Sequence, residues 1–355
     1  MALNLFAHTC TELAAEFKRR YGKGRYHATG VYREVFRNGG FRLTEIPEFR
    51  SSPKLACDII RDLAFPSCRI LEVQEDAVLK FVSRLPDRNT IESVLIPAGK
   101  RSTLCVSSQV GCRMGCRFCA TGGMGFVRDL TVEEIVWQVV AARFLLRQPV
   151  NNIVFMGMGE PLDNFENVLG AIEVISDQQG LDVPLRRITV STAGHADGIR
   201  RLAARNKPNL RLAVSLNAAE DGLRDILMPI NRKFPLEELR KTLVRFPLGR
   251  DSVLFIEYVL IRRINDSPRH AEELAALVDG LKVRVNLIAF NPSPGAVYSP
   301  PDMETVHRFQ QQLVGKNIFT RLRRSYGNRI MAACGQLGAA HSVRAVKPLA
   351  GLLNG

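Results

Sequence analysis

The spacing of apolar residues divides the chain into a helical start, a run of short strands and a long alternating region. Near the N-terminus, Leu13 and Phe17 recur at helical spacing, and Val31 and Val35 do so again further along. Two short amphipathic helices account for both sets. We therefore predict a small helical accessory domain over residues 1–66.

The pattern changes to short strands over residues 67–102. Apolar runs that read RILEV, AVLKFVSR and TIESVLIP are separated by the turn-like stretches QED and LPDRN. Short connections of this kind join neighbouring antiparallel strands. We predict a β-strand extension here that leads into the main domain.

Strand-like and helix-like runs alternate over residues 103–324, which predicts βαβ units and a parallel sheet. Six repeats favour an α/β fold of the partial (β/α)6 barrel type, followed by a C-terminal tail over residues 325–355. The strands read TLCVSS, NNIVFMG, RITVST, LRLAVSLN, VLFIEYVLI and VRVNLIAF, and the helices cover 131–146, 164–178, 196–205, 236–247 and 268–280.

Unusual residues follow these strands at their carboxyl ends. A cysteine-rich loop follows the first strand, Gly159 and Glu160 follow the second, Ser191 and Ser215 end the third and fourth, and Asn291 follows the sixth. Parallel α/β proteins place their sites at this edge of the sheet. Segments far apart in the sequence therefore predict one pocket.

Three of the eight cysteines form a metal-binding motif. Cys112, Cys116 and Cys119 have the spacing C-x3-C-x2-C, and three thiolates hold three irons of a [4Fe–4S] cluster while leaving the fourth iron open. The alternative is a zinc site with a distant fourth ligand, although zinc motifs usually pair two such cysteine sets. Three further cysteines with apolar neighbours are interpreted as core residues: Cys10, Cys57 and Cys68.

The charge balance indicates what the protein binds. Lys and Arg number 49 against 35 Asp and Glu, a formal net charge of +14, which favours a polyanionic partner such as RNA. No signal peptide or membrane-spanning apolar run is visible, so we expect a cytoplasmic protein. Candidate phosphate-binding groups, which solvated surface charge also explains, are Arg186–Arg187, Arg200–Arg201, Arg205, Lys207, Arg211, Arg321, Arg323 and Arg324.

The ordered motifs resemble the RlmN/Cfr family of radical S-adenosylmethionine (SAM) RNA adenine methyltransferases. The resemblance covers residues 88–340, and the helical start is compatible with that family's accessory domain. The motifs are VSSQVGCRMGCRFCATGGMGF, FMGMGEPLDN, ITVSTAG, SLNAAEDGLRDILMPIN, IRRINDS, NLIAFNP and AACGQL.

The resemblance implies a set of cofactor-binding residues. Cys112, Cys116 and Cys119 would ligate the cluster, whose open iron would bind one of the two SAM molecules used per turnover. Residues that match the SAM-binding motifs are Gly159, Glu160, Ser191, Ser215, Leu216, Asn217 and Asn291. The chain departs from relatives at Asn217, where histidine is common, so a proton-transfer role at this position is in doubt.

The resemblance also implies catalytic roles for two further cysteines and a glutamate. Cys334 would receive a methyl group and pass its carbon to adenine, and Cys105 would then release the product by forming a transient disulfide bond with Cys334. Glu92 would accept a proton, a role that Cys105 could also fill. From position alone, Cys105 reads as a strand core residue, while the glycines around Cys334 suggest a mobile tail. The chain also departs from the family pattern at Arg329, a position where relatives usually have aspartate.

The resemblance implies methylation of adenine C2 in large-subunit rRNA, with tRNA as a further substrate. Methylation at C8, as in Cfr, is the near alternative. A radical SAM enzyme that modifies a peptide and an iron–sulfur RNA-binding module are alternatives of other classes. We also expect an electron donor such as flavodoxin or ferredoxin, no membrane association, and a monomer.

Overall fold

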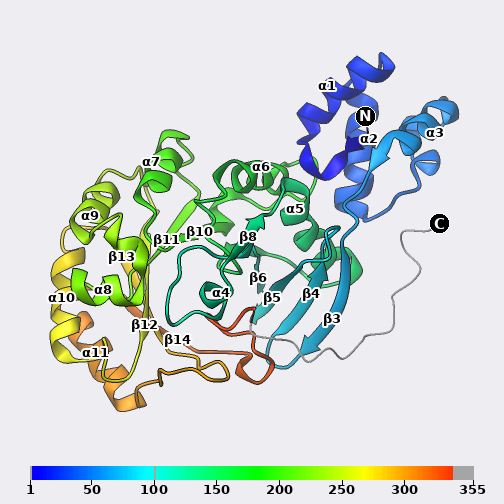
Figure 1. Ribbon diagram of the computed structural model, residues 1–355. Coiled ribbons are helices and arrows are strands. Elements are labelled where there is room, and N and C mark those ends of the chain that lie inside the picture. The colour runs from blue at the N-terminus through cyan, green and yellow to red at the C-terminus, as the bar shows by residue number, and fades with distance from the viewer. Residues whose placement is uncertain (1, 100, 339–355) are drawn as a thin grey trace.

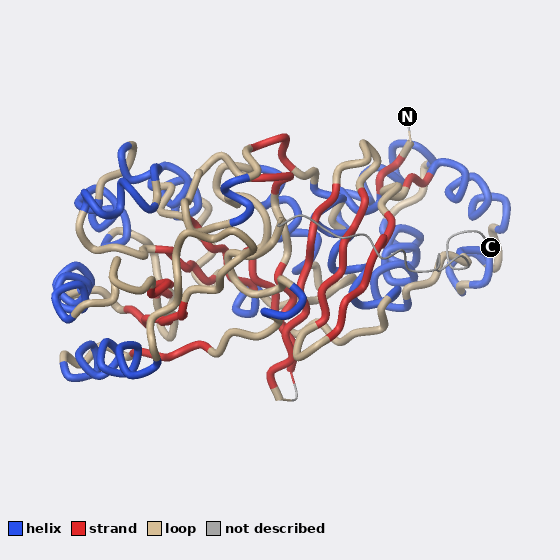
Figure 2. Tube along the Cα trace, turned by 60° about the horizontal axis from the view of Figure 1, so that its bottom comes forward, coloured by secondary structure: helices blue, strands red, loops and turns tan. Residues whose placement is uncertain are grey.

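A ten-stranded mixed sheet forms the framework of the molecule (Figure 1, Figure 2). The computed structural model describes residues 2–99 and 101–338. In order across the sheet the strands are β14 (Thr320–Arg323), β13 (Val283–Ala289), β12 (Leu254–Leu260), β11 (Arg211–Ser215), β10 (Ile188–Thr192), β9 (Asn152–Phe155), β6 (Arg101–Cys105), β5 (Thr90–Ala98), β4 (Leu79–Arg84) and β3 (Arg69–Glu75).

The strands from β6 to β14 in this sheet pair in parallel, which confirms the predicted α/β fold with a parallel core. A helix precedes each strand from β9 to β14, so the carboxyl ends of these strands meet at one edge. Strand β14 is additional to the six predicted strands. The helices of this part are α4 (Ala120–Gly123), α5 (Val132–Val140), α6 (Phe165–Ser176), α7 (Ala196–Ala204), α8 (Asp221–Leu227), α9 (Leu236–Val244), α10 (Pro268–Val278) and α11 (Met303–Gly315).

The extension predicted over residues 67–102 forms the antiparallel end of the same sheet. Strands β3, β4 and β5 pair in sequence, and β5 pairs with β6, so that Val94 lies opposite Cys105. The sheet thus runs without a break past residue 102. A separate antiparallel ribbon, β7 (Gln109–Gly111) and β8 (Phe126–Asp129), flanks the cysteine loop.

The N-terminal region is helical and packs beside the sheet near α5 and α6 (Figure 1). It contains α1 (Cys10–Tyr21), α2 (Arg25–Arg33), α3 (Pro53–Asp62) and the short parallel pair β1 (Leu3–Asn4) and β2 (Leu63–Ala64). Thr9 and Glu12 form a capping box at the start of α1, and Gly22 ends the helix in a left-handed conformation. The Cys10 amide donates to Asp177, which ties α1 to the end of α6.

The predicted core position of Cys57 is wrong. Cys10 and Cys68 are buried, but Cys57 is exposed. Helix α3 is amphipathic and buries Ala56 and Ile59, and Cys57 lies on the opposite face. Within the described residues, no helix is long and apolar enough to cross a lipid bilayer.

Candidate active site

A cavity of about 160 Å³ opens at the carboxyl edge of the parallel strands. Its walls come from the cysteine loop, the strand ends and the C-terminal tail. Sequence-predicted site residues that line it are Cys112, Cys116, Cys119, Gly159, Glu160, Ser191, Ser215, Asn217 and Cys334. The other predicted site residues are buried outside this lining: Glu92, Cys105, Leu216 and Asn291.

Glycines shape the loop that carries the three cysteines. Gly111 and Gly115 adopt left-handed φ angles of 73° and 64°, which cost a residue with a Cβ more than they cost glycine. A Cβ at Gly122 would lie 2.9 Å from the Cys116 carbonyl oxygen, so the chain passes close to itself here. The loop therefore turns tightly enough to bring its thiols to one side of the cavity.

The donor set of this loop fits an iron–sulfur cluster. Burial raises the pKa of the Cys112 thiol to about 12, and burial together with repulsion from Cys119 and Cys112 raises that of Cys116 well above its usual range. Such thiols become thiolates readily only when a positively charged metal binds them. Among the described residues, no group of three or more His, Cys, Asp or Glu is arranged to hold a single metal ion. In a cubane cluster, by contrast, each thiolate binds a different iron.

A polar network joins the cysteine loop to the loop after β9. Arg113 pairs with Asp163 at 2.9 Å and stacks over the Phe126 ring at 3.7 Å. The Gln109 side-chain amide donates to Asp163 at 3.2 Å and accepts from the Glu160 amide at 2.8 Å. These contacts fix the two loops against each other before any cofactor binds.

Glu160 places a buried carboxylate in the cavity wall. It is 2% exposed, and its oxygens accept hydrogen bonds from the amides of Ala193 at 2.7 Å and Leu162 at 3.1 Å. Burial raises its pKa to about 7, and these hydrogen bonds oppose the rise. Gly159 has φ 99°, and a Cβ there would lie 2.5 Å from the Gln109 Cβ, so only glycine fits beside this carboxylate.

The residue at position 217 has a structural reason to be asparagine. Asn217 has φ 58°, a left-handed conformation that asparagine tolerates better than most residues. Its side chain accepts from the Val259 amide at 2.8 Å and donates to the Met228 sulfur at 3.2 Å. The side chain therefore shapes the cavity through neutral hydrogen bonds.

Leu216 and Asn291 support the cavity from outside. Leu216 is 2% exposed in the apolar core, and its amide donates to the Glu257 carbonyl at 2.9 Å. The Asn291 side chain donates to the Cys334 carbonyl at 3.2 Å. Asn291 thus holds the segment that carries Cys334.

The C-terminal segment is docked up to residue 338. The Ala120 amide donates to the Gly335 carbonyl at 2.8 Å, the Thr121 hydroxyl to the Leu337 carbonyl at 2.6 Å, and the Gln336 side chain to the Pro292 carbonyl at 2.8 Å. The segment that carries Cys334 is thus held against the cavity in this structure, and the rest of the tail, 339–355, lies outside the described residues. Docking directs the accessible surface of Cys334 into the cavity.

Cys105 and Cys334 lie close enough to influence each other electrostatically. Burial raises the pKa of the Cys105 thiol to about 12, with repulsion from Cys334 adding to the rise. Burial also raises the pKa of Cys334, and Arg323 opposes this. Both thiols are free in this structure, so the expected disulfide bond is not formed here.

A charged pair on the cavity wall, Glu257 with Arg323, was absent from the sequence-derived site. Glu257, in the middle of β12, is 5% exposed and lies 3.5 Å from the Arg323 guanidinium at the end of β14. Asn286 donates to the other Glu257 oxygen at 2.7 Å. The available signal was an acidic residue within the otherwise apolar strand run VLFIEYVLI. The sequence indicated Arg323 only as a phosphate contact, whereas the structure places it in the cavity.

Glu92 lies on the β5 strand beside a buried lysine. The Lys80 ammonium is 4.0 Å from the Glu92 carboxylate, and both side chains are 2% exposed. Val94, two residues beyond Glu92, pairs with Cys105, so Glu92 and Cys105 share one face of the sheet. Glu92 is thus near the cysteine pair along the sheet but outside the cavity lining.

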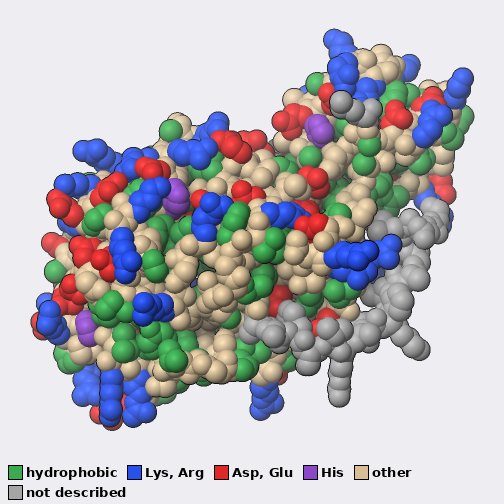
Figure 3. All heavy atoms as spheres, in the orientation of Figure 1, with side chains coloured by type: hydrophobic (Ala, Val, Ile, Leu, Met, Phe, Trp, Pro, Cys, Tyr) green, Lys and Arg blue, Asp and Glu red, His purple; other side chains and the backbone are tan. Residues whose placement is uncertain are grey.

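Half of the candidate phosphate-binding residues are already ion-paired. Figure 3 shows basic and acidic side chains interspersed over the helices at the left of this face. Arg201 and Arg205 both pair with Glu166, Arg200 pairs with Asp197 and Glu238, and Lys207 pairs with Glu173. These pairs reduce the positive potential that the outer helices offer to RNA.

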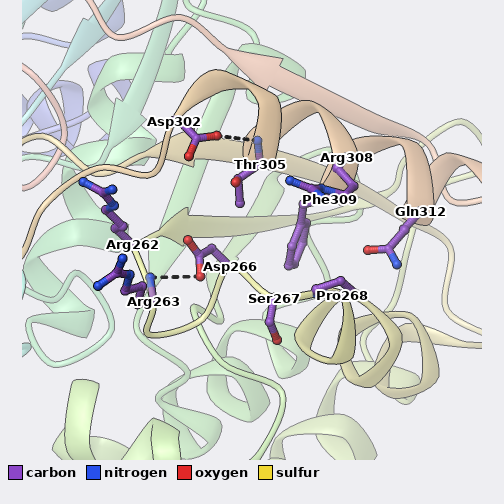
Figure 4. A pocket seen from close by; sticks show the side chains of 10 residues that line it. All are labelled: Arg262, Arg263, Asp266, Ser267, Pro268, Asp302, Thr305, Arg308, Phe309 and Gln312. Carbon is purple, nitrogen blue, oxygen red and sulfur yellow. Dashed lines mark hydrogen bonds between the residues drawn. The ribbon is translucent and has the colours of Figure 1, made fainter.

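A second cavity, of about 340 Å³, lies between the ends of β12, α10 and α11 (Figure 4). Three arginines line it: Arg262, Arg263 and Arg308. Two carboxylates share the space, because Asp266 accepts from the Arg263 amide at 3.0 Å and Asp302 accepts from the Thr305 amide at 2.8 Å. This cavity is basic, but it is separate from the cysteine-lined one.

Known proteins similar to this chain point to one family. The family model of the radical SAM superfamily matches residues 106–276. A probable dual-specificity RNA methyltransferase RlmN 1 from Protochlamydia amoebophila is 42% identical over 95% of this chain and 94% of its own. A dual-specificity RNA methyltransferase RlmN from Desulfotalea psychrophila is 46% identical over 78% of each chain. The crystal structure of a radical SAM methyltransferase from Sphaerobacter thermophilus superposes with a TM-score of 0.86 at 39% identity, covering 96% of this chain and all of the other.

The relative from Protochlamydia amoebophila and the structure from Sphaerobacter thermophilus match 95% and 96% of this chain. Membership in the radical SAM superfamily implies a [4Fe–4S] cluster and SAM, which the donor set of the cysteine loop fits. The resemblance drawn from the ordered motifs is therefore confirmed, and the chain belongs to the RlmN family of dual-specificity RNA methyltransferases within the radical SAM superfamily.

Proposed function

We propose that this protein methylates C2 of adenine in both large-subunit rRNA and tRNA through a methyl group carried by Cys334. The observation that carries the proposal is that Cys334 lines the same cavity as the three cysteines of the loop, with Cys105 near enough for the charges of the two sulfurs to interact. The dual-specificity names of the relatives support two RNA substrates. An RNA-binding module would need neither thiol.

The first step is methylation of Cys334 by ordinary displacement. The Cys334 thiol loses its proton and the sulfur attacks the methyl carbon of a first SAM, which leaves as S-adenosylhomocysteine. The positive charge of Arg323 favours the thiolate form of Cys334 and opposes the effect of burial. Hydrogen bonds to the carbonyls of Cys334, Gly335 and Leu337 hold the nucleophile in place.

The cluster would be held by the thiolates of Cys112, Cys116 and Cys119. Glu160 would accept a hydrogen bond from the amino group of a second SAM. When bound, these cofactors supply a 5′-deoxyadenosyl radical, which removes one hydrogen atom from the Cys334 S-methyl group. The Cys334 methylene carbon then bonds to adenine C2, so protein and RNA are covalently joined. Restoring the aromatic ring would require loss of the C2 proton and of one electron, which the cluster oxidised during SAM cleavage would accept. Cys105 or Glu92 accepts that proton.

Cys105 would then release the product. Its thiolate attacks the Cys334 sulfur, the sulfur–carbon bond breaks with its electron pair on carbon, and that carbon takes a proton to become the methyl group. A Cys105–Cys334 disulfide bond remains and must be reduced before the next turnover. The docked tail holds Cys334 near enough to Cys105 for the charges of the two sulfurs to interact.

The two cysteine roles predict opposite behaviour of two variants. Cys105→Ala should accumulate a covalent RNA adduct that survives denaturing gels and disappears after ribonuclease treatment, because addition can proceed but release cannot. Cys334→Ala and the double variant should form none. Intact protein mass and nucleoside analysis for 2-methyladenosine provide the readout. Wild-type methylation by Cys105→Ala would contradict the two-cysteine mechanism, and 8-methyladenosine would contradict the assignment to C2.

A further inference from the structure

Arg224 is a completely buried cation that the proposed mechanism does not use. It lies in α8, within the motif SLNAAEDGLRDILMPIN, and is 0% exposed. Burial of a guanidinium is costly unless its donors are satisfied, and breaking such a site is strongly destabilising. In the part of the chain that the structure describes, the hydrogen-bond acceptors of the Arg224 side chain are three backbone carbonyls and one side-chain amide, and none is a carboxylate. Its position therefore calls for a functional explanation.

The Arg224 guanidinium joins the ends of the two strands that face the cofactor site. It donates to the carbonyl of Ala193, just after β10, at 2.7 Å, and to the carbonyls of Ser215 and Leu216 at the end of β11 at 3.4 Å and 3.0 Å. Gly194 leaves room for this contact, because a Cβ there would lie 2.8 Å from the guanidinium nitrogen. One side chain thus sets the spacing of segments that carry proposed SAM-binding residues.

The same helix is anchored to the cysteine loop. The amide of Arg117, the residue after Cys116, donates to the Leu227 carbonyl at the end of α8 at 3.0 Å. Arg224 and Cys116 are near enough for their charges to interact across the protein interior. A cation near Cys116 stabilises negative charge on the Cys116 sulfur.

The third guanidinium nitrogen of Arg224 donates to the side chain of Asn231. Asn231 accepts from the guanidinium at 2.8 Å and donates to Asp221 at 2.8 Å and to Asp225 at 2.7 Å. The two carboxylates thus orient Arg224 through a neutral amide and balance its charge from a distance. The positive charge of Arg224 nevertheless lowers the pKa of Cys116, against the larger effect of burial.

We propose that Arg224 is a positioning residue of the cofactor site, which fixes the ends of β10 and β11 for SAM and raises the reduction potential of the cluster through its charge. The inference rests on the proposed function, because it takes the three cysteines as cluster ligands. One-electron reduction adds negative charge to the cluster, and a nearby cation stabilises the reduced form. The two roles depend on different properties of Arg224. The hydrogen bonds to the strand ends need the planar guanidinium group, whereas the effect on the reduction potential needs only a positive charge.

Substitutions at Arg224 test the two roles separately in cluster-loaded protein handled without oxygen. Arg224→Gln removes both charge and fork, so the midpoint potential should shift to more negative values and SAM affinity should fall by about 10–100-fold. Arg224→Lys keeps the charge, so the potential should stay near that of the wild type while SAM affinity falls. The potential is measured by EPR-monitored titration with dithionite, and SAM affinity by equilibrium dialysis.

Two further variants provide the control and a milder test. Arg143 is a half-buried arginine that donates to the carbonyls of Leu181 and Val150 and does not line the cavity, so Arg143→Gln should change neither quantity. Asp225→Asn keeps its bond to Asn231 but removes a negative charge, so the potential should shift to more positive values. If the Arg224 variants do not fold, Asp225→Asn decides the electrostatic role.

Unchanged potential and SAM affinity in folded Arg224→Gln, or an unchanged potential in Asp225→Asn, would overturn the proposal and leave Arg224 a packing residue. None of these measurements needs RNA. A failure of RNA methylation would therefore bear on the proposed function, and a failure of these shifts on Arg224 alone.

Discussion

At the scale of single residues, the site depends on charges placed where water is excluded. Glu160 is the clearest case, because its carboxylate is buried and yet accepts two backbone hydrogen bonds. Burial favours the neutral acid, and the hydrogen bonds favour the anion. The balance leaves its pKa at about 7, so its charge changes within the physiological range.

The raised pKa of Glu160 predicts that SAM binding weakens in mild acid. Below pH 7 the protonated acid no longer offers a charged acceptor to the SAM amino group, so affinity should fall as the pH drops from 8 to 6, approaching about tenfold per pH unit at the acidic end. Equilibrium dialysis of cluster-loaded protein measures this. The side chain in Glu160→Gln does not titrate, so any remaining pH dependence of SAM affinity should come from ionisation of SAM itself. Identical pH profiles for both proteins would exclude the role.

At the scale of elements, alternation of strands and helices was enough to predict the parallel sheet and the edge that carries the site. Strand β14 could not be read in this way, because its four residues TRLR contain two arginines and no apolar run. Arg323 consequently looked like a surface charge. Contacts between distant segments, such as α4 with the Cys334 loop, leave no periodic signal, so the docking of the tail was also beyond the sequence.

The docking of the tail predicts that loosening α4 frees the segment that carries Cys334. Thr121→Val removes the hydrogen bond to the Leu337 carbonyl, which should cost about 1 kcal/mol and raise the population of an undocked segment about fivefold. Hydrogen–deuterium exchange of peptides that cover residues 333–337, followed by mass spectrometry, should become faster to match. Peptides from α10 are the internal control, and their exchange should not change. Unchanged exchange at residues 333–337 would mean that the other tail contacts suffice.

At the scale of the whole molecule, net charge and charge distribution lead to different expectations. The surplus of +14 favours RNA. Yet the arginines on α7 are neutralised by acidic partners, whereas Arg262 and Arg263 follow β12 at the same sheet edge as the cavity and are exposed. We therefore expect groups at this edge, more than those on α7, to contact the backbone of an RNA whose target base has left its stack.

This distribution predicts which arginines set the salt dependence of RNA binding. Affinity for tRNA should fall steeply between about 50 and 200 mM salt, with a log–log slope set by the number of phosphate contacts. Joint substitution of Arg262 and Arg263 by Gln should weaken binding and flatten the slope by about 1–2, because each lost phosphate contact removes about one. The matched pair Arg201→Gln and Arg205→Gln should change the slope little, since Glu166 already holds both groups. Filter binding across a salt series measures all three proteins. An equal effect of the two double variants would show that the outer helices, and not the cavity edge, meet the RNA.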